Sequence, residues 1–263
     1  MDTASVVWLI IVAAFCTLLP IGLLLWWRRT RKAKLAPFFV GALIFVVFAR
    51  GLEALLHYAC LLTDNPVSRA INGNTWLYVL YGALAAGIFE ETGRYVAFRF
   101  LLPKKRFPER DTAVTCGIGH GGAESILLIG VTFGLYAAIA LMTRTGNHEQ
   151  ALALTKGDAA ALSLLLGQIG EITPGACIFN MIERVFAIIL HIGLSIYVFL
   201  AVRDRTQRSW FPFAVALHAI ADMPAALYQR GVLPVWSVEL WLAVVSLYTL
   251  RSARKCYLEL TDP

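Results

Sequence analysis

The chain has 263 residues, of which 59% are hydrophobic and 15% charged, and its mean hydropathy is +0.68. This composition excludes an ordinary soluble domain and is typical of a polytopic membrane protein. The net charge of +6 does not indicate nucleic-acid binding, because the basic residues lie in separate short loops. The five cysteines form no CxxC pair, so neither a disulfide framework nor a thiolate metal site is expected.

Seven apolar runs are long enough to cross a membrane as helices, which takes about 20 residues each. They predict an all-α, polytopic helical bundle with spans at about 5–27, 37–62, 75–102, 112–143, 172–202, 211–230 and 234–250. We expect residues 1–263 to form a single membrane domain, with a catalytic-like core at about 75–230. The apolar stretch from Ala159 to Ile169 is compatible with an interfacial helix or with part of a longer fifth span.

The distribution of basic residues predicts the orientation of the bundle. The first span is followed by the basic segment 28–32, which is typical of an anchor with its N-terminus outside. Loops on the predicted inner side hold about 15 Lys and Arg residues, against about four in the outer loops. The sequence therefore predicts a multi-pass protein of the cell (inner or cytoplasmic) membrane, with the N-terminus out, the C-terminus in and the lipid bilayer around it.

Acidic and imidazole side chains occur in four of the predicted spans at one depth. Counted at 1.5 Å per residue, Glu90, His120, His191 and His218 lie roughly 10–18 Å from the inner ends of their spans. A charged group in hydrocarbon is costly, so such residues are rare and usually functional. Their shared level predicts one buried polar site near the middle of the membrane.

The spacing within each helix also fits a single site. Three pairs separated by four residues present both members on one helix face, namely His120 with Glu124, His191 with Ser195, and His218 with Asp222. Glu90 and Glu91 diverge by about 100°, so only one of them faces the centre squarely. Arg94 is placed to neutralise whichever carboxylate turns away.

The side chains also suit particular chemistry. Neutral imidazole and carboxylate are typical zinc ligands, and a catalytic zinc keeps one position open for water. A carboxylate beside that water can take its proton and deliver it to a leaving amine.

Structural roles compete with these functional interpretations. His191 alone is as well explained by a hydrogen bond in helix packing, and Glu90 or Glu91 with Arg94 by an ion pair within one helix. Glu183 with Arg184 is interpreted as a supporting ion pair. The shared depth of His120, Glu124 and His218 is what favours a site over packing.

At these residues the chain resembles the YhfC-type intramembrane metalloproteases. The matching segments are EETGRY at 90–95, GHGGAE at 119–124, the ER pair ahead of His191, and HAIAD at 218–222. The wider superfamily includes type II CAAX prenyl proteases, PrsW proteases and the Aph subunit of gamma-secretase. The resemblance implies that Glu90 is the water-activating base, with Glu91 as its helper. It also implies that Glu124 takes the ligand place of the second motif, where His120 replaces a usual Phe, and that His218 and Asp222 form the third motif.

Two functions are compatible with these residues. The first is an intramembrane, zinc-dependent endopeptidase that cleaves a membrane protein or peptide. Its catalytic candidates are Glu90, Glu91, Arg94 and Asp222, and its metal ligands are a subset of His120, Glu124, His191 and His218. The second is a non-enzymatic, Aph-like membrane scaffold, or an ion- or proton-coupled carrier that uses the same polar site. No internal repeat favours a carrier, and the presence of acid and base at one level favours the enzyme.

Overall fold

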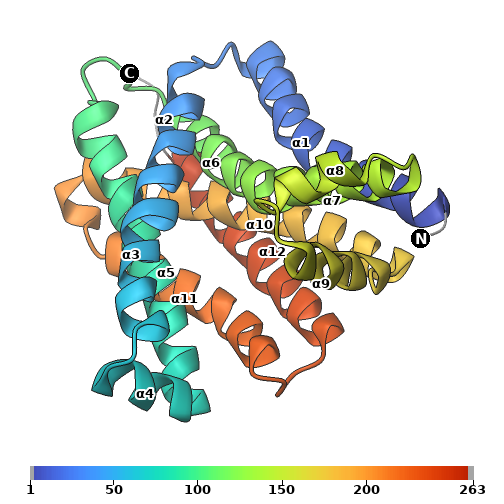
Figure 1. The fold of residues 1–263 in the computed structure, drawn as a ribbon. Helices are drawn as coiled ribbons and strands as arrows, with labels where there is room; N and C mark the ends of the chain where they lie inside the picture. Colours follow the sequence, from blue (N-terminus) through green and yellow to red (C-terminus); the bar gives the residue numbers. More distant parts are fainter. Residues whose placement is uncertain (1–2, 260–263) are drawn as a thin grey trace.

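The computed structural model describes residues 3–259, and this part of the chain is an all-helical bundle without strands (Figure 1). Several α-helical and π-helical segments follow one another without a break and form longer helices. In chain order the segments are α1 (Thr3–Arg31), α2 (Ala36–Ile44), η1 (Phe45–Glu53), α3 (Ala54–His57), η2 (Tyr58–Leu62), α4 (Pro66–Gly73), α5 (Thr75–Val96), η3 (Ala97–Leu101), α6 (Asp111–Glu124), η4 (Ser125–Gly130), α7 (Val131–Arg144), α8 (His148–Leu154), α9 (Ala159–Gly170), α10 (Pro174–Arg203), η5 (Arg205–Gln207), α11 (Trp210–Gln229) and α12 (Val235–Glu259).

Each of the seven predicted apolar runs coincides with a continuous helical segment. Five helices of the described chain are long and apolar enough to cross a membrane, namely Thr3–Arg31, Ala36–Leu62, Asp111–Arg144, Pro174–Arg203 and Arg205–Gln229. The runs that form α5 and α12 are not among the five. In α5 the reason is the group of charged residues Glu90, Glu91 and Arg94 near its C-terminal end. The all-α membrane fold is therefore confirmed, whereas the number of seven spans and their orientation remain predictions.

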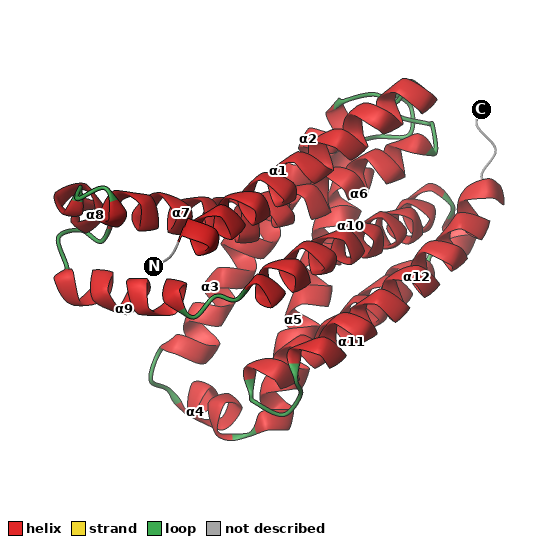
Figure 2. Cartoon of the chain, turned by 90° about the vertical axis from the view of Figure 1, so that its right-hand side faces the viewer, coloured by secondary structure: helices red, strands yellow, loops and turns green. Residues whose placement is uncertain are grey.

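The helix ends lie on two sides of the bundle. In Figure 2 the start of α1, the helices α4, α8 and α9, and the α11–α12 turn lie toward the left and bottom. The α1–α2 connection and the end of α12 lie toward the upper right. The first side is the one that the basic residues predict to be outside.

The apolar stretch between the fourth and fifth predicted spans forms a helix of its own. Helix α9 ends at Gly170, and α10 begins only at Pro174. The side chain of Thr173 accepts a hydrogen bond from the backbone N–H of Ala176 and so caps α10. A longer fifth span is therefore excluded as the explanation of this stretch, because a cap and an N-terminal proline start a new helix there.

Helix α10 is the central helix of the bundle. In its most apolar window 72% of the residues are buried, against 22% to 39% in the other four candidate spans. It packs against α6, α12 and α1 (Figure 2). A polar residue on α10, such as His191, is consequently surrounded by protein and not by lipid.

Glycines allow α6 to approach its neighbours at backbone distance. A Cβ at Gly117 would lie 2.6 Å from the Cα of Ile192, and a Cβ at Gly121 would lie 2.9 Å from the ring of His191. On the other face, a Cβ at Gly119 would lie 2.0 Å from the carbonyl oxygen of Phe38 in α2. Small residues let helix backbones approach closely in this way, and the packing holds α6 between α2 and α10.

Adding one methyl group at Gly119 is expected to destabilise the protein. The Cβ of Gly119→Ala would collide with backbone, which cannot rotate away, so we expect a loss of about 1–3 kcal/mol in the free energy of unfolding. The matched control is Gly22→Ala in α1, where an added Cβ meets nothing within 4 Å. Unfolding in mixed micelles measures both variants, and equal stabilities would contradict the packing described here.

Pro224 lies inside α11 and removes one backbone donor from the helix. The carbonyl of Ile220 consequently lacks its usual partner, and this predicts a local kink. In the structure the indole nitrogen of Trp241, in α12, donates a hydrogen bond of 2.9 Å to this carbonyl. A neighbouring helix thus satisfies the freed group, as the interior of a membrane protein requires.

Candidate metal centre

Four helices bring the eight predicted site residues into one continuous network of polar contacts. Helix α5 contributes Glu90, Glu91 and Arg94, α6 contributes His120 and Glu124, α10 contributes His191, and α11 contributes His218 and Asp222. The side chains of Arg94 and His120 are fully buried, whereas that of Asp222 is 37% exposed. The network therefore lies inside the bundle and reaches accessible space at Asp222.

Glu90 is the carboxylate that faces the histidines. Its Oε2 lies 2.8 Å from Nε2 of His120 and 3.8 Å from Nε2 of His218. The same oxygen lies 3.7 Å from Arg94, beyond hydrogen-bond distance. Of the two adjacent glutamates, Glu90 is thus the one that Arg94 leaves free to act on other groups.

Glu91 is the carboxylate that turns away and is neutralised. Its Oε1 accepts hydrogen bonds from Arg94 and, at 2.7 Å, from Nδ1 of His218. Because a carboxylate accepts, Nδ1 of the His218 ring carries a proton, while Nε2 faces the carboxylates of Glu90 and Asp222. Carboxylates orient the metal-binding histidines of many proteins in this manner. Glu91 therefore directs Nε2 of His218 toward Glu90.

Arg94 and Arg184 tie the central helix into the network. Arg94 Nη2 lies 2.5 Å from Nδ1 of His191, and Nε2 of the same ring donates to Glu124. Arg184 in turn donates to Glu124 over 2.7 Å and to Glu183 over 2.5 Å. His191 is consequently held from both sides, and Glu124 is held by its contacts to α10.

Three of these residues are placed to hold a metal ion. Glu90, His191 and His218 each offer one ligand atom, and these atoms lie within 4.8 Å of one another. All three residues are buried. One carboxylate and two imidazoles form a donor set that suits zinc and related divalent ions.

Two observations support the fit of a cation to this centre. Three buried or nearly buried carboxylates, those of Glu90, Glu91 and Glu124, face only two guanidinium groups, and the remaining contacts of these carboxylates are to imidazoles. A buried charge of this kind is expensive unless a cation or a proton offsets it. In addition, within residues 3–259, Nδ1 of His120 and Oε2 of Glu91 are buried without a hydrogen-bond partner. The centre therefore has more carboxylates than guanidinium groups, and two of its possible metal-ligand atoms have no hydrogen-bond partner.

The sequence located the site but did not assign every contact. His120 and Glu124, which were predicted as ligands, contact Glu90 and His191 respectively, and the roles of all eight residues remain predictions. Arg184 was given only a supporting role, yet it binds Glu124 directly. The sequence does indicate that Arg184 faces the site, because Arg184 is seven residues before His191 and so lies on the same helix face.

Comparison with known proteins agrees with this geometry. Residues 15–242 match the family described as YhfC intramembrane metalloprotease. The chain is 36% identical over 258 residues to the Uncharacterized membrane protein YhfC of Bacillus subtilis (strain 168), covering 96% of this chain and 98% of the relative. No solved structure matches the chain.

Proposed function

This chain belongs to the YhfC intramembrane metalloprotease family, and we propose that it is a metal-dependent endopeptidase of the cell membrane. Its substrate is a membrane protein or peptide, of which it hydrolyses one peptide bond. The observation that carries the proposal is the buried group of Glu90, His191 and His218, whose ligand atoms lie within 4.8 Å of one another. We propose zinc as the metal, because imidazole is a usual zinc ligand and a catalytic zinc keeps a position open for the water that Glu90 would activate.

His191 and His218 are the proposed metal ligands, because their ligand atoms and that of Glu90 lie within 4.8 Å of one another. Glu91 accepts a hydrogen bond from Nδ1 of His218, so Nε2 is the nitrogen of this ring that would bind the metal. His191 offers its Nδ1, which accepts from Arg94 in the structure, so a bound metal and Arg94 compete for one lone pair. The other two ligand candidates contact members of this group. Glu124 contacts and orients His191, and His120 contacts and orients Glu90.

Hydrolysis needs a base, an acid and a way to bind the carbonyl. When bound, zinc lowers the pKa of water toward about 7 and polarises the carbonyl group. Glu90 takes one proton from the attacking water, whose oxygen bonds to the carbonyl carbon. As the carbon–nitrogen bond breaks, Glu90 returns this proton to the amine that leaves. Asp222 lies 3.4 Å from Nε2 of His218, on the accessible side of that ring.

Metal analysis of the purified full-length protein tests the proposal. We expect about one zinc ion per chain in the wild type and near zero in His218→Ala, since the substitution removes a ligand. The matched control is His148→Ala, an exposed histidine in α8, which should retain the metal. A wild type that stays metal-free after zinc is supplied would defeat the protease and favour the scaffold.

A further inference from the structure

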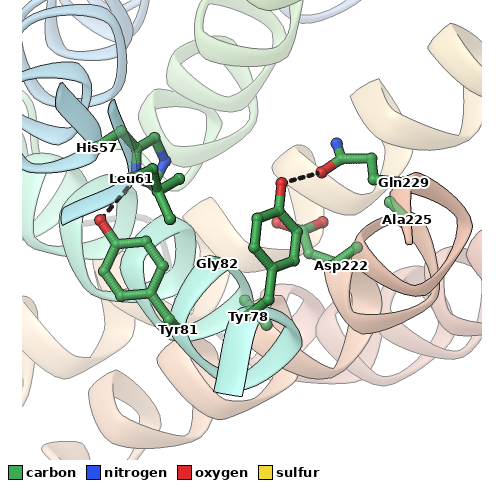
Figure 3. Close-up of a pocket in the computed structure, with 10 residues that line it drawn as sticks. His57, Leu61, Tyr78, Tyr81, Gly82, Asp222, Ala225 and Gln229 are labelled. Atoms are coloured by element: carbon green, nitrogen blue, oxygen red, sulfur yellow. Dashed lines mark hydrogen bonds between the residues drawn. The ribbon is translucent and has the colours of Figure 1, made fainter. Parts of the chain in front are cut away.

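A cavity lies at each end of the contact between α5 and α11. The two backbones touch at Gly87, where an added Cβ would lie 2.6 Å from the carbonyl oxygen of Val215. Toward the start of α5 lies a cavity of about 290 Å³, whose lining includes Tyr78, Asp222 and Gln229 (Figure 3). Toward the start of α11 lies another, of about 450 Å³. The two cavities differ in whether their polar groups already have partners.

The polar groups of the smaller cavity are paired with one another. The hydroxyl of Tyr78 donates to the side-chain oxygen of Gln229 over 2.9 Å, and that of Tyr81 lies 2.9 Å from Nδ1 of His57 (Figure 3). A ligand would have to break these contacts before it formed its own, so it would gain little binding free energy from them. This cavity therefore needs no ligand to satisfy these groups.

The larger cavity is lined by polar side chains without partners. Its lining consists of Tyr95 at the end of α5, Ala201 of α10, Arg208, and Phe211 at the start of α11. In the part of the chain that the structure describes, neither the guanidinium of Arg208 nor the hydroxyl of Tyr95 has a hydrogen bond or an ion pair. The ring of Tyr95 packs edge-on against that of Phe211, with the centroids 5.3 Å apart. The volume lies in the range of small-molecule sites, about 300–1,000 Å³.

The surroundings of the larger cavity are rich in basic residues. The stretch 203–209 contains three arginines and one aspartate. It lies against the stretch 103–106, because Arg203 donates hydrogen bonds to the carbonyl oxygens of Leu102 and Phe107. The stretch 103–106 has no acidic residue and adds Lys104, Lys105 and Arg106. This positive charge is complementary to an anion.

The position of the larger cavity brings it to the surface of the bilayer. It lies near the inner ends of the third and sixth predicted spans, and arginine and tyrosine at the ends of spans reach the level of the lipid head groups. Ile88, two turns before Tyr95 on the same face of α5, is exposed, as are Phe100 in η3 and Phe213 in α11. A ligand with an anionic head and an apolar tail therefore matches both the cavity and the surface beside it.

We propose that the cavity at Tyr95 and Arg208 binds an anionic glycerophospholipid from the leaflet that the basic loops face. The lipid phosphate accepts hydrogen bonds from Arg208 and Tyr95, because a planar guanidinium suits phosphate oxygens. Its acyl chains lie along the exposed apolar residues of α5 and α11. A zwitterionic lipid binds more weakly, because the arginines repel its ammonium group.

The bound lipid connects the two helices that carry most of the candidate metal centre. Glu90 and Glu91 come from α5, and His218 and Asp222 come from α11. Lipid binding consequently stabilises the relative placement of these helices. The inference goes beyond the proposed function and does not depend on the protein being an enzyme.

Native mass spectrometry of the full-length protein, released from detergent micelles, tests the lipid site. Phosphatidylglycerol and phosphatidylcholine with identical acyl chains are compared at about 0.15 M salt, which screens exposed charges more than about 8 Å apart. The wild type should bind phosphatidylglycerol about tenfold more tightly than phosphatidylcholine, since each basic residue near a membrane surface contributes about 1 kcal/mol, or about fivefold in affinity.

Arg208→Gln should reduce this preference to less than about twofold, whereas Arg208→Lys keeps the charge and should retain part of it. Arg208 is exposed and has no partner to lose, so both variants fold. The matched control is Arg205→Gln, which removes the same charge from an exposed position of η5 outside the lining of the cavity. It should keep the preference of the wild type. Tyr95→Phe retains the ring contact with Phe211 and should weaken phosphatidylglycerol binding about threefold, the effect of one lost hydrogen bond.

Three results would overturn the proposal. The first is equal affinity of the wild type for both lipids, and the second is an equal loss in Arg208→Gln and Arg205→Gln. The third is displacement of the lipid by excess glycerol phosphate, which offers the head group without acyl chains and would identify a site for a soluble phosphate compound. None of these measurements involves the metal, so the lipid site and the proposed function stand or fall separately.

Discussion

Glu90→Gln is expected to lower the rate of peptide cleavage by about 10²–10⁴-fold, the usual contribution of a general base. Glutamine has nearly the size of glutamate and can still accept the hydrogen bond at 2.8 Å from His120. It cannot take a proton from water, so the fold is retained while proton transfer is lost. Release of labelled fragments from an unfolded, membrane-anchored reporter measures the rate, and zinc content is measured on the same samples.

The control for this variant is Glu149→Gln, which changes a glutamate in the first turn of α8, at an exposed position. It should cleave like the wild type. Full activity in Glu90→Gln would remove the base from the mechanism. A variant that loses zinc together with its activity would make Glu90 a ligand instead, as its place in the group with His191 and His218 allows.

Arg94→Met is expected to lower the free energy of unfolding by about 3–5 kcal/mol, because it leaves the buried carboxylate of Glu91 without its arginine partner. Arg94 is fully buried and binds Glu91, which is fully buried as well. Methionine fills similar space but carries neither charge nor donor. Unfolding with sodium dodecyl sulfate in mixed micelles, followed by tryptophan fluorescence, measures the change.

Two further variants show whether burial of the charge is the cause. The ion pair of Arg69 with Asp64 has side chains 64% and 82% exposed, so Arg69→Met should cost no more than about 1 kcal/mol. Adding Glu91→Gln to Arg94→Met should recover part of the loss, because it removes the unpaired charge. A similar cost for both arginines, or no recovery in the double variant, would contradict a buried ionic centre.

By itself the sequence determined the class of fold and which polar residues share a helix face. Apolar runs of about 20 residues can satisfy their backbone groups in a membrane only as helices, so the helical bundle followed from composition. The four-residue spacing of His120 with Glu124, and of His218 with Asp222, followed from the helical period. These properties are local, because they depend on neighbours along one helix.

The tertiary structure decided how those faces meet. From the sequence, either Glu90 or Glu91 was able to face the histidines. The packing of α5 against α11 placed Glu91 in a hydrogen bond with Nδ1 of His218 and left Glu90 facing Nε2 of that ring. The contact of Arg184 with Glu124 and the cavity lined by Tyr78 and Gln229 also join residues from different helices. Close packing at residues such as Gly117 and Gly119 determines how each helix is rotated and which helix it contacts. The periodicity of a single helix shows which residues share a face, but not which other helix that face will contact.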